Sequence, residues 1–370
     1  MRRIKRHQRC PYCGSLDTKR HGVKILRCQR PNRTHMRHQR WYCKQCSRTF
    51  TLPYNSYLPQ LDQRAIELYF DTGTSYRAVG RTLQMRPMTA YNRIIRMGFN
   101  SKSPLEVSLE LKPQWSGYLI VDGDSILIGK HKESFLLGVD AYSQDIPHAI
   151  LAEHEDGMNW MYFFLVLKDS IRYPLKGIIS DGDPAIQEAR EAVFPEVPWQ
   201  LCVRHFEKEI DRFLRYRFTQ KRGYWREIDR FLRVVHEMLY AESFGEAQKY
   251  LLAISIDPGF KQAGLLAVIE KIKKKFPNLV TYYFHPGMPR TSNIAEGVIS
   301  RLDAKINQAD GYKCHHTCWA TLKMLITWYR FKKFTDCRKK NRHKNGKSPL
   351  QLAKVDTQNI KWIRFSQRSH

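Results

Sequence analysis

The chain has 370 residues, enough for about two to three domains, and 42% of them are hydrophobic, so its composition allows a large core. It carries 63 Lys and Arg against 35 Asp and Glu, and the formal net charge of +28 far exceeds what solubility requires. That balance points to a polyanionic partner. No run reaches the roughly 18 apolar residues of a membrane helix, and no apolar segment follows the basic start, so we expect neither a membrane anchor nor a secretory signal.

The charge is unevenly distributed along the chain. Residues 1–50 carry 15 Lys and Arg against one acid, Asp17, and residues 330–370 carry 13 against two. Residues 101–200 carry 8 against 16. A basic run is often only a solvated face. An acidic centre between basic ends fits better with a metal site in the centre and DNA contacts made by the flanks.

Residues 1–53 form a cysteine module. The pairs Cys10-x-x-Cys13 and Cys43-x-x-Cys46 place four thiolates at the spacing of a closed, structural Zn²⁺ site, which predicts a zinc ribbon. This segment has too few aliphatic residues to form a stable core without a bound metal ion. The long intervening loop leaves an alternative open, because a knuckle ligand could be replaced by Cys28, His35 or His38.

Residues 60–98 predict a helix-turn-helix. Asp62 suits an N-cap, a second helix covers 75–83, and Pro87 suits the first position of a third helix that Gly98 stops. Gln84 occupies the tight turn, where Gly is often found. The outward side chains of the third helix are suited to base edges in a major groove: Arg86, Met88, Thr89, Asn92, Arg93 and Arg96. A plain three-helix bundle is the alternative.

A linker at 99–116 precedes a mixed α/β domain at 117–335. Apolar strand-like runs at 118–122, 125–129, 134–141 and 147–152 suggest an antiparallel meander; a helix (157–172), a strand (177–180), a helix (183–193) and a short strand (199–203) follow. Three strands and then alternating helix and strand is the order of a ribonuclease H-like core. Residues 206–275 have helical periodicity and predict an inserted all-α subdomain, 280–284 are strand-like, and 336–370 form a basic C-terminal tail.

Three separated carboxylates stand out in this domain. Asp122 and Asp181 each end an apolar run, and Glu296 lies where a late helix begins. Two acids at strand ends and one on a helix could hold two Mg²⁺ or Mn²⁺ ions roughly 4 Å apart and cut a phosphodiester. Asp124, two residues along the same strand face, and Asp183 are rival ligands.

The local motifs around these acids match a known family. They are Val121-Asp122-Gly, Ser180-Asp181-Gly-Asp-Pro-Ala-Ile, Cys202-Val-Arg-His205 and Thr291-Ser-Asn-Ile-Ala-Glu296. Over roughly residues 115–335 the chain resembles DDE-type transposases, most closely the Mutator-like (MULE) superfamily and its bacterial insertion-sequence relatives. The Cys-x-x-His spacing after the second acid and the helical insertion before the last Glu are similar to that superfamily.

The resemblance implies that Asp122, Asp181 and Glu296 are the catalytic metal ligands, with two Mg²⁺ or Mn²⁺ ions as cofactors. The reaction would be hydrolysis at a transposon end, followed by attack of the freed 3′-hydroxyl on target DNA. The partners would be double-stranded DNA of the transposon ends and the target, and a second copy of the chain in a dimer or higher assembly. We expect no membrane partner, and a cytoplasmic, nucleoid-associated protein if the source is prokaryotic.

Several readings stay open. Cys202 and His205 could pack beneath the inserted helices or position DNA beside the active site. The segment Cys314-His315-His316 with Cys318 invites a second metal site, although it also fits the start of a helix. A transposase-derived DNA-binding protein without catalysis, or a ribonuclease H-like nuclease without strand transfer, would share most of these features.

Overall fold

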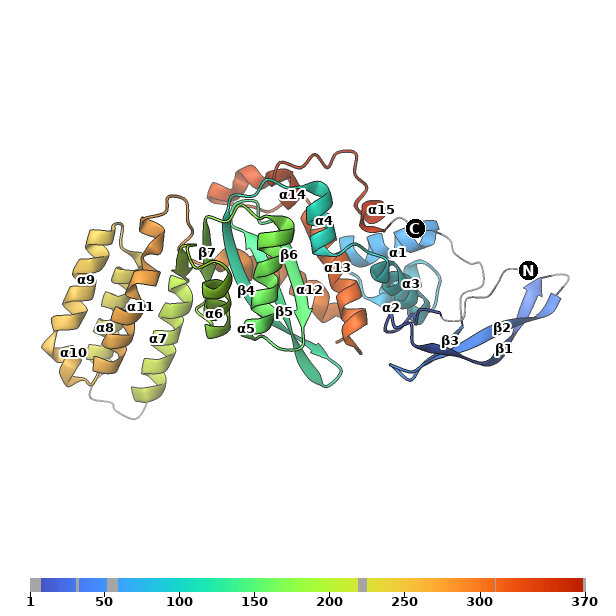
Figure 1. Cartoon of the computed structure of the whole chain (residues 1–370), viewed down its shortest axis with the longest axis horizontal. Coiled ribbons are helices and arrows are strands. Elements are labelled where there is room, and N and C mark those ends of the chain that lie inside the picture. The colour runs from blue at the N-terminus through green and yellow to red at the C-terminus, as the bar shows by residue number, and fades with distance from the viewer. Residues whose placement is uncertain (1–7, 31–32, 52–58, 219–224, 310, 369–370) are drawn as a thin grey trace.

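The computed structural model describes residues 8–30, 33–51, 59–309 except 219–224, and 311–368. The side chains of residues 26–30, 33–38, 59, 217, 218, 309 and 340 are outside that description. The molecule is elongated, with a small sheet at one end, a five-stranded sheet in the middle and a helical bundle at the other end (Figure 1).

The central sheet is mixed, with strand order β6-β5-β4-β7-β8. Its strands are β4 (Tyr118–Ile128), β5 (His131–Asp140), β6 (His148–Ala152), β7 (Gly177–Ser180) and β8 (Trp199–Leu201). β4, β5 and β6 form the predicted antiparallel meander, while β7 and β8 run parallel to β4. The predicted runs 118–122 and 125–129 form one continuous strand, and the other strands of this sheet follow in the predicted order.

Alternation along β4 divides the interior into two cores, because successive side chains of a strand point to opposite faces. Leu119 and Val121 pack with helices α5 (Gly157–Leu165) and α6 (Pro184–Val193), with a π-helical turn at Val166–Ile171 between them. Ile120 packs on the other face with α12 (Asn293–Ile306) and the almost fully buried α13 (His315–Phe331). Within the described ranges, no helix is both long enough and apolar enough to cross a bilayer.

The predicted all-α insertion is a bundle at one end of the molecule (Figure 1). Its helices are α7 (Val203–Phe218), α8 (Trp225–Tyr240), α9 (Phe244–Ile256), α10 (Pro258–Gln262) and α11 (Leu266–Leu279). The expected strand at 280–284 is wrong, since Thr281–Tyr283 form a 3₁₀ turn. Polar groups of β8 accept hydrogen bonds from this turn: Tyr282 N donates to Gln200 Oε1 (2.9 Å) and Thr281 Oγ1 donates to Trp199 O (2.9 Å).

The three helices of the predicted helix-turn-helix are α1 (Pro59–Asp71), α2 (Tyr76–Thr82) and α3 (Pro87–Phe99). Asp62 is not the N-cap of α1, which begins at Pro59; its carboxylate is fully buried. Gly98 is not a stop signal either, because α3 continues through it to Phe99. It is a point of close packing instead, since a Cβ at Gly98 would lie 2.5 Å from the Ala320 carbonyl oxygen of α13.

The linker and the tail are more ordered than the sequence suggests. Residues 99–116 include α4 (Pro104–Leu111), which starts with a capping box between Ser103 and Glu106. The C-terminal segment is not a free tail: it forms a 3₁₀ stretch (Lys339–Lys344) and short helices α14 (Pro349–Leu352) and α15 (Trp362–Ser366). It returns to the linker, where Arg368 Nη2 lies 2.7 Å from Glu106 Oε2.

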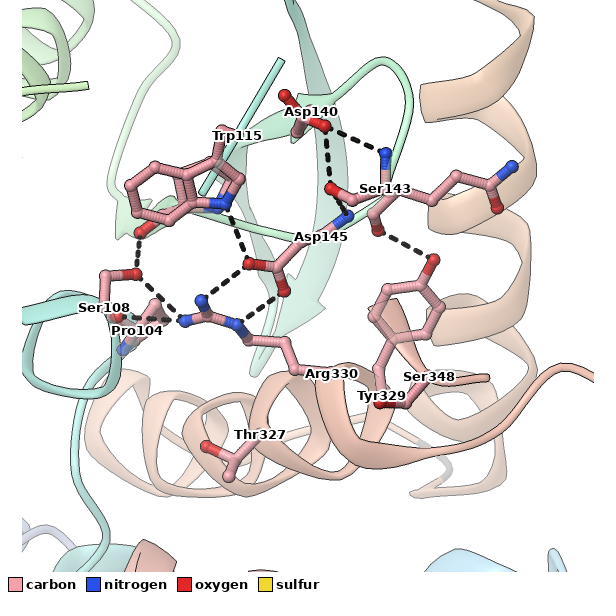
Figure 2. A network of polar contacts seen from close by, with 12 residues as sticks. Pro104, Ser108, Trp115, Asp140, Ser143, Asp145, Thr327, Tyr329, Arg330 and Ser348 are labelled. Carbon is pink, nitrogen blue, oxygen red and sulfur yellow. Dashed lines mark hydrogen bonds and ion pairs between the residues drawn. The ribbon is translucent and has the colours of Figure 1, made fainter. Parts of the chain in front are cut away.

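A buried ion pair joins these segments to the central sheet. Arg330 of α13 and Asp145, after β5, are both fully buried and pair through two contacts of 2.8 Å (Figure 2). The same guanidinium donates to Ser108 Oγ and Pro104 O of α4, and Trp115 Nε1 donates to Asp145. One side chain therefore ties together α13, the linker helix and the edge of the sheet.

The remaining sheet is antiparallel, with strands β1 (Thr18–Arg30), β2 (Arg33–Cys43) and β3 (Thr49–Thr51). Its small core consists of Trp41, Phe50 and the cysteines of the two knuckles. A core this small depends on cross-links or metal for stability.

Candidate active site

Asp122 and Asp181 are brought together by the parallel pairing of their strands. Ile120 of β4 pairs with Ile179 of β7, and continuing that register by two residues puts Asp122 level with Asp181. Residues level on parallel strands direct their side chains to the same face, and the charge of Asp181 accordingly acts on Asp122. Asp122 lies within β4 rather than at its end, whereas Asp181 directly follows β7 as predicted.

Glu296 lies in the first turn of α12, and its charge also acts on Asp122. Its Oε1 is buried and has no hydrogen-bond partner among the described residues, and His205 Nε2 lies 3.5 Å away. A buried carboxylate oxygen without a donor is costly unless a cation satisfies it. This oxygen is accordingly suited to a metal ion.

The electrostatics of Asp122 show how closely the acids are grouped. Burial, and then the negative charge of Asp181, raise the pKa of Asp122 to about 7, with a smaller contribution from Glu296. The positive charge of His205 acts in the opposite direction. Like charges gathered in a half-buried site are the arrangement that a divalent cation relieves.

Ser292 connects the second motif to the third acid. Its backbone N–H and its hydroxyl both donate to Cys202 Sγ, at 3.2 and 3.3 Å, and its Oγ lies 3.2 Å from His205 Nδ1. The other ring nitrogen of His205 faces Glu296. Hydrogen bonding with Cys202 raises the pKa of His205. Burial acts to raise the pKa of Cys202, but the hydrogen bonds from His205 and Ser292 outweigh burial and lower it. Cys202 and His205 thus hold the start of α12 beside the acids.

Further acids that the motifs did not single out surround the three. Burial and the charges of Asp183, Asp181 and Asp124 raise the pKa of Glu155. The Glu155 carboxylate lies against the backbone at Gly123, between Asp122 and Asp124. A Cβ added to Gly123 would lie only 2.4 Å from this carboxylate. Trp160 is fully buried, and its Nε1 donates to Glu155 Oε1 at 3.1 Å.

Asp303 lies two turns beyond Glu296 on α12, and burial and Asp124 raise its pKa to about 6. The spacing of seven residues on one helix face was a signal that the sequence contained. Glu155 carried no comparable signal, because it precedes α5 and approaches only through the fold.

The rival ligands have other roles in the structure. Asp183 accepts a hydrogen bond from Ala185 N at 2.7 Å and caps α6, as expected of an acid that starts a helix. Asp124 lies near Asp303 and contributes to the raised pKa of that carboxyl. Asp122 and Asp181 therefore remain the two acids paired across the strands.

The four knuckle cysteines converge as predicted. The ligand atoms of Cys10, Cys13, Cys43 and Cys46 lie within 4.8 Å of one another, and this is the one group of three or more such atoms among the described residues. Two of the S–S distances are 3.4 and 3.6 Å, too long for a disulfide and close to the roughly 3.8 Å edge of a tetrahedral zinc–thiolate site. The cluster is compatible with zinc. The carboxylates of the candidate active site are more widely spaced.

The alternative zinc ligands lie outside the description, since the side chains of Cys28, His35 and His38 are not included. The second metal site considered at Cys314 is not formed by the described residues. Cys314 Sγ donates to Tyr12 O at 3.3 Å, and His315 Nδ1 lies 2.5 Å from Glu133 Oε2. That segment instead packs against the cysteine module and the sheet.

Two of the six side chains predicted to face outward from α3 pair instead with an acid of α1. Arg86, Met88 and Thr89 are exposed as expected, and Asn92 is half-buried. Arg93 and Arg96 do not simply face solvent, because both pair with the buried carboxylate of Asp62. No local pattern in the sequence indicates that an acid of α1 lies behind this helix.

Comparison with known proteins identifies the family. The model of the Mutator family of transposases matches residues 137–325, about half of the chain. A search of curated proteins finds no match. The HTLV-2 integrase catalytic core domain, solved in complex with magnesium, is 16% identical over 34% of this chain and 86% of its own, with a TM-score of 0.21.

The simian T-cell lymphotropic virus intasome, solved with the PP2A regulatory subunit B56 gamma, is 15% identical over 49% of this chain and 70% of its own, with a TM-score of 0.19. TM-scores this low add nothing to the assignment, which rests on the family match and on the motifs around the acids. The chain belongs to the Mutator family of transposases.

Proposed function

We propose that this transposase cuts DNA at transposon ends and joins the freed ends to target DNA, using two Mg²⁺ or Mn²⁺ ions held by Asp122, Asp181 and Glu296. The proposal is supported chiefly by the parallel pairing of β4 and β7, whose register continued by two residues brings Asp122 level with Asp181, and by the effect of Asp181 on the pKa of Asp122. Bound there, the ions would activate the attacking water and stabilise the leaving 3′ oxygen.

The chain's own groups perform the positioning. Asp122 is fixed by its strand, and its Oδ1 accepts from Gly123 N at 3.0 Å. Asp181 Oδ1 accepts from Asp183 N at 3.1 Å, which holds it at the start of the turn before α6. His205, held by Ser292 and Cys202, orients Glu296 on the opposite side.

The same acids would serve both chemical steps, because each step exchanges one oxygen for another at phosphorus. Hydrolysis leaves a 3′-hydroxyl on the transposon end, and that hydroxyl then attacks a phosphodiester of the target. No covalent bond between protein and DNA is needed. Joining two ends favours at least a dimer of the chain, and zinc in the cysteine cluster would be structural, because four protein ligands leave no open position.

Cleavage of a supercoiled plasmid carrying the element's own ends tests this proposal. The full-length protein with Mg²⁺ or Mn²⁺ is compared with Asp122→Asn, Asp181→Asn and Glu296→Gln. Asp169→Asn is the control, because it removes an exposed acid of the same domain away from the site. We expect cutting and joining by the wild type and the control alone, and binding of the ends by all five proteins.

The other outcomes separate the rival functions. Specific binding without cutting by any of the five would favour a transposase-derived DNA-binding protein. Cutting without joining would favour a nuclease that lacks strand transfer.

A further inference from the structure

The N-terminal sheet and helix α3 enclose an open cleft of about 800 Å³. One wall belongs to the cysteine module and the other to α3, two parts that the sequence suggested as separate DNA-binding units. The lining includes Lys24 and Arg40 on the first wall, and Thr89, Asn92, Arg93 and Arg96 on the second.

The cysteine module contacts α3 directly and also contacts the start of α13, which packs against α3. Cys314 of α13 donates to the Tyr12 carbonyl beside the first knuckle. Gly14 lies against the ring of Phe99 at the end of α3, since a Cβ there would be 3.2 Å from the ring. The Arg48 guanidinium lies 5.2 Å from the Tyr12 ring centroid and supports the knuckle from within the module. The first two contacts connect the cysteine module to the helices beside the cleft.

The lining of the cleft is cationic. Among the described residues that line it, four are basic and none is an acid. Asp62 lies behind Arg93 and Arg96 and contacts both. These contacts hold the two arginines in place on this wall. Thr89 and Asn92 add neutral groups able to hydrogen-bond base edges.

We propose that the cysteine module and α3 bind one stretch of double-stranded DNA together, as a single composite surface. Thr89 and Asn92 of α3 face the bases in the major groove, and Lys24 and Arg40 of the sheet hold phosphates of the adjoining backbone. The proposal deepens the proposed function, which supplies the duplex as occupant. It makes the zinc cluster a support for one wall of the reading site.

Binding is measured by fluorescence anisotropy with the full-length, zinc-loaded protein in buffer without Mg²⁺ or Mn²⁺, so that no cutting occurs. The probes are a labelled duplex of the element's terminal sequence and a random-sequence duplex of equal length. The variants are Lys24→Ala, Arg40→Ala and Asn92→Ala. Arg20→Ala is the matched control, an exposed basic residue of the same strand as Lys24 that does not line the cleft.

Loss of a phosphate contact weakens binding to any sequence and lowers its dependence on salt. We expect Lys24→Ala and Arg40→Ala to weaken both probes several-fold and to reduce the slope of log affinity against log salt by about 0.9 each. Asn92→Ala should weaken the terminal duplex roughly tenfold and the random duplex little. The conservative Lys24→Arg should restore the salt slope.

Hydroxyl-radical footprinting tests whether the two walls share one site. We expect the nucleotides that lose protection in Lys24→Ala to lie within about one helical turn, roughly 10 base pairs, of those lost in Asn92→Ala. Footprints farther apart, or Lys24→Ala and Arg40→Ala variants that bind like Arg20→Ala, would overturn the composite surface. If those variants still cleaved DNA with Mn²⁺, the proposed function would stand although the composite DNA-binding surface had been rejected.

Discussion

Burial and the negative charge of Asp181 disfavour the ionised form of Asp122. Its pKa of about 7 in the folded chain lies above the ordinary value of 3.8, so the folded state binds this proton more tightly than the unfolded chain does. The metal-free protein therefore loses stability as the pH rises from about 4 to about 7, and bears the full penalty above 7.

Asp122→Asn should remove this penalty because the amide does not ionise. In Mg²⁺- and Mn²⁺-free buffer at pH 8, we expect the variant to gain on the order of 1 kcal/mol, after allowance for solvent screening of a partly exposed group. That corresponds to a rise of about 2 °C in Tm, and the gain should vanish near pH 4. Differential scanning calorimetry at both pH values measures it. A variant less stable than wild type at pH 8 would contradict this account, and Asp169→Asn should show no gain.

Ser292 acts through its neighbours and needs to touch neither DNA nor metal. Ser292→Ala removes the hydroxyl contacts with Cys202 and His205 and leaves the backbone bond to Cys202 in place. We expect roughly tenfold slower cleavage, because a misplaced Glu296 lowers the efficiency of the site. The Mn²⁺ concentration for half-maximal activity should also rise, while end binding stays unchanged. Ser125→Ala, an exposed serine on β4, is the control. Unaltered Mn²⁺ dependence would show that the serine only packs.

At the scale of elements, the turn between α2 and α3 holds one residue in an unfavourable backbone conformation. Gln84 is exposed and has φ of 50°, in the left-handed region that a residue with a Cβ adopts at a penalty. Gln84→Gly should raise the free energy of unfolding by about 0.5 to 1 kcal/mol, as followed by urea denaturation. Arg81→Gly, one turn earlier inside α2, should instead lower it by about 1 kcal/mol. Equal effects of the two changes would show that backbone conformation at residue 84 does not decide the result.

Elements with a strong local pattern were predicted well. Pro87 and the buried Ile94 and Ile95 marked α3, and the short apolar run before Asp181 marked β7. Elements whose backbone partners come from elsewhere were missed. The 3₁₀ turn at Thr281–Tyr283 forms because Gln200 accepts from it, and nothing within residues 280–284 reports that partner.

At the scale of the whole molecule, the buried pair of Arg330 and Asp145 joins three parts of the chain. Arg330→Met keeps much of the side-chain volume but leaves Asp145 buried without its cation. We expect a loss of about 3 to 5 kcal/mol in the free energy of unfolding, measured with guanidinium chloride. Arg338→Met, at an exposed arginine shortly after α13, should change stability by less than about 0.5 kcal/mol. A small loss for Arg330→Met would mean that the network is not essential to the assembly.

The sequence by itself determined the family motifs, the cysteine knuckles, the helical insertion and the three acids, because each is carried by residues close together along the chain. The tertiary structure decided what lies between them. It put Glu155 and Asp303 beside the acids, set Ser292 between Cys202 and His205, and turned Arg93 and Arg96 toward Asp62. It also folded the basic C-terminal segment back onto the linker. These contacts join residues far apart in the chain, so no local pattern announces them.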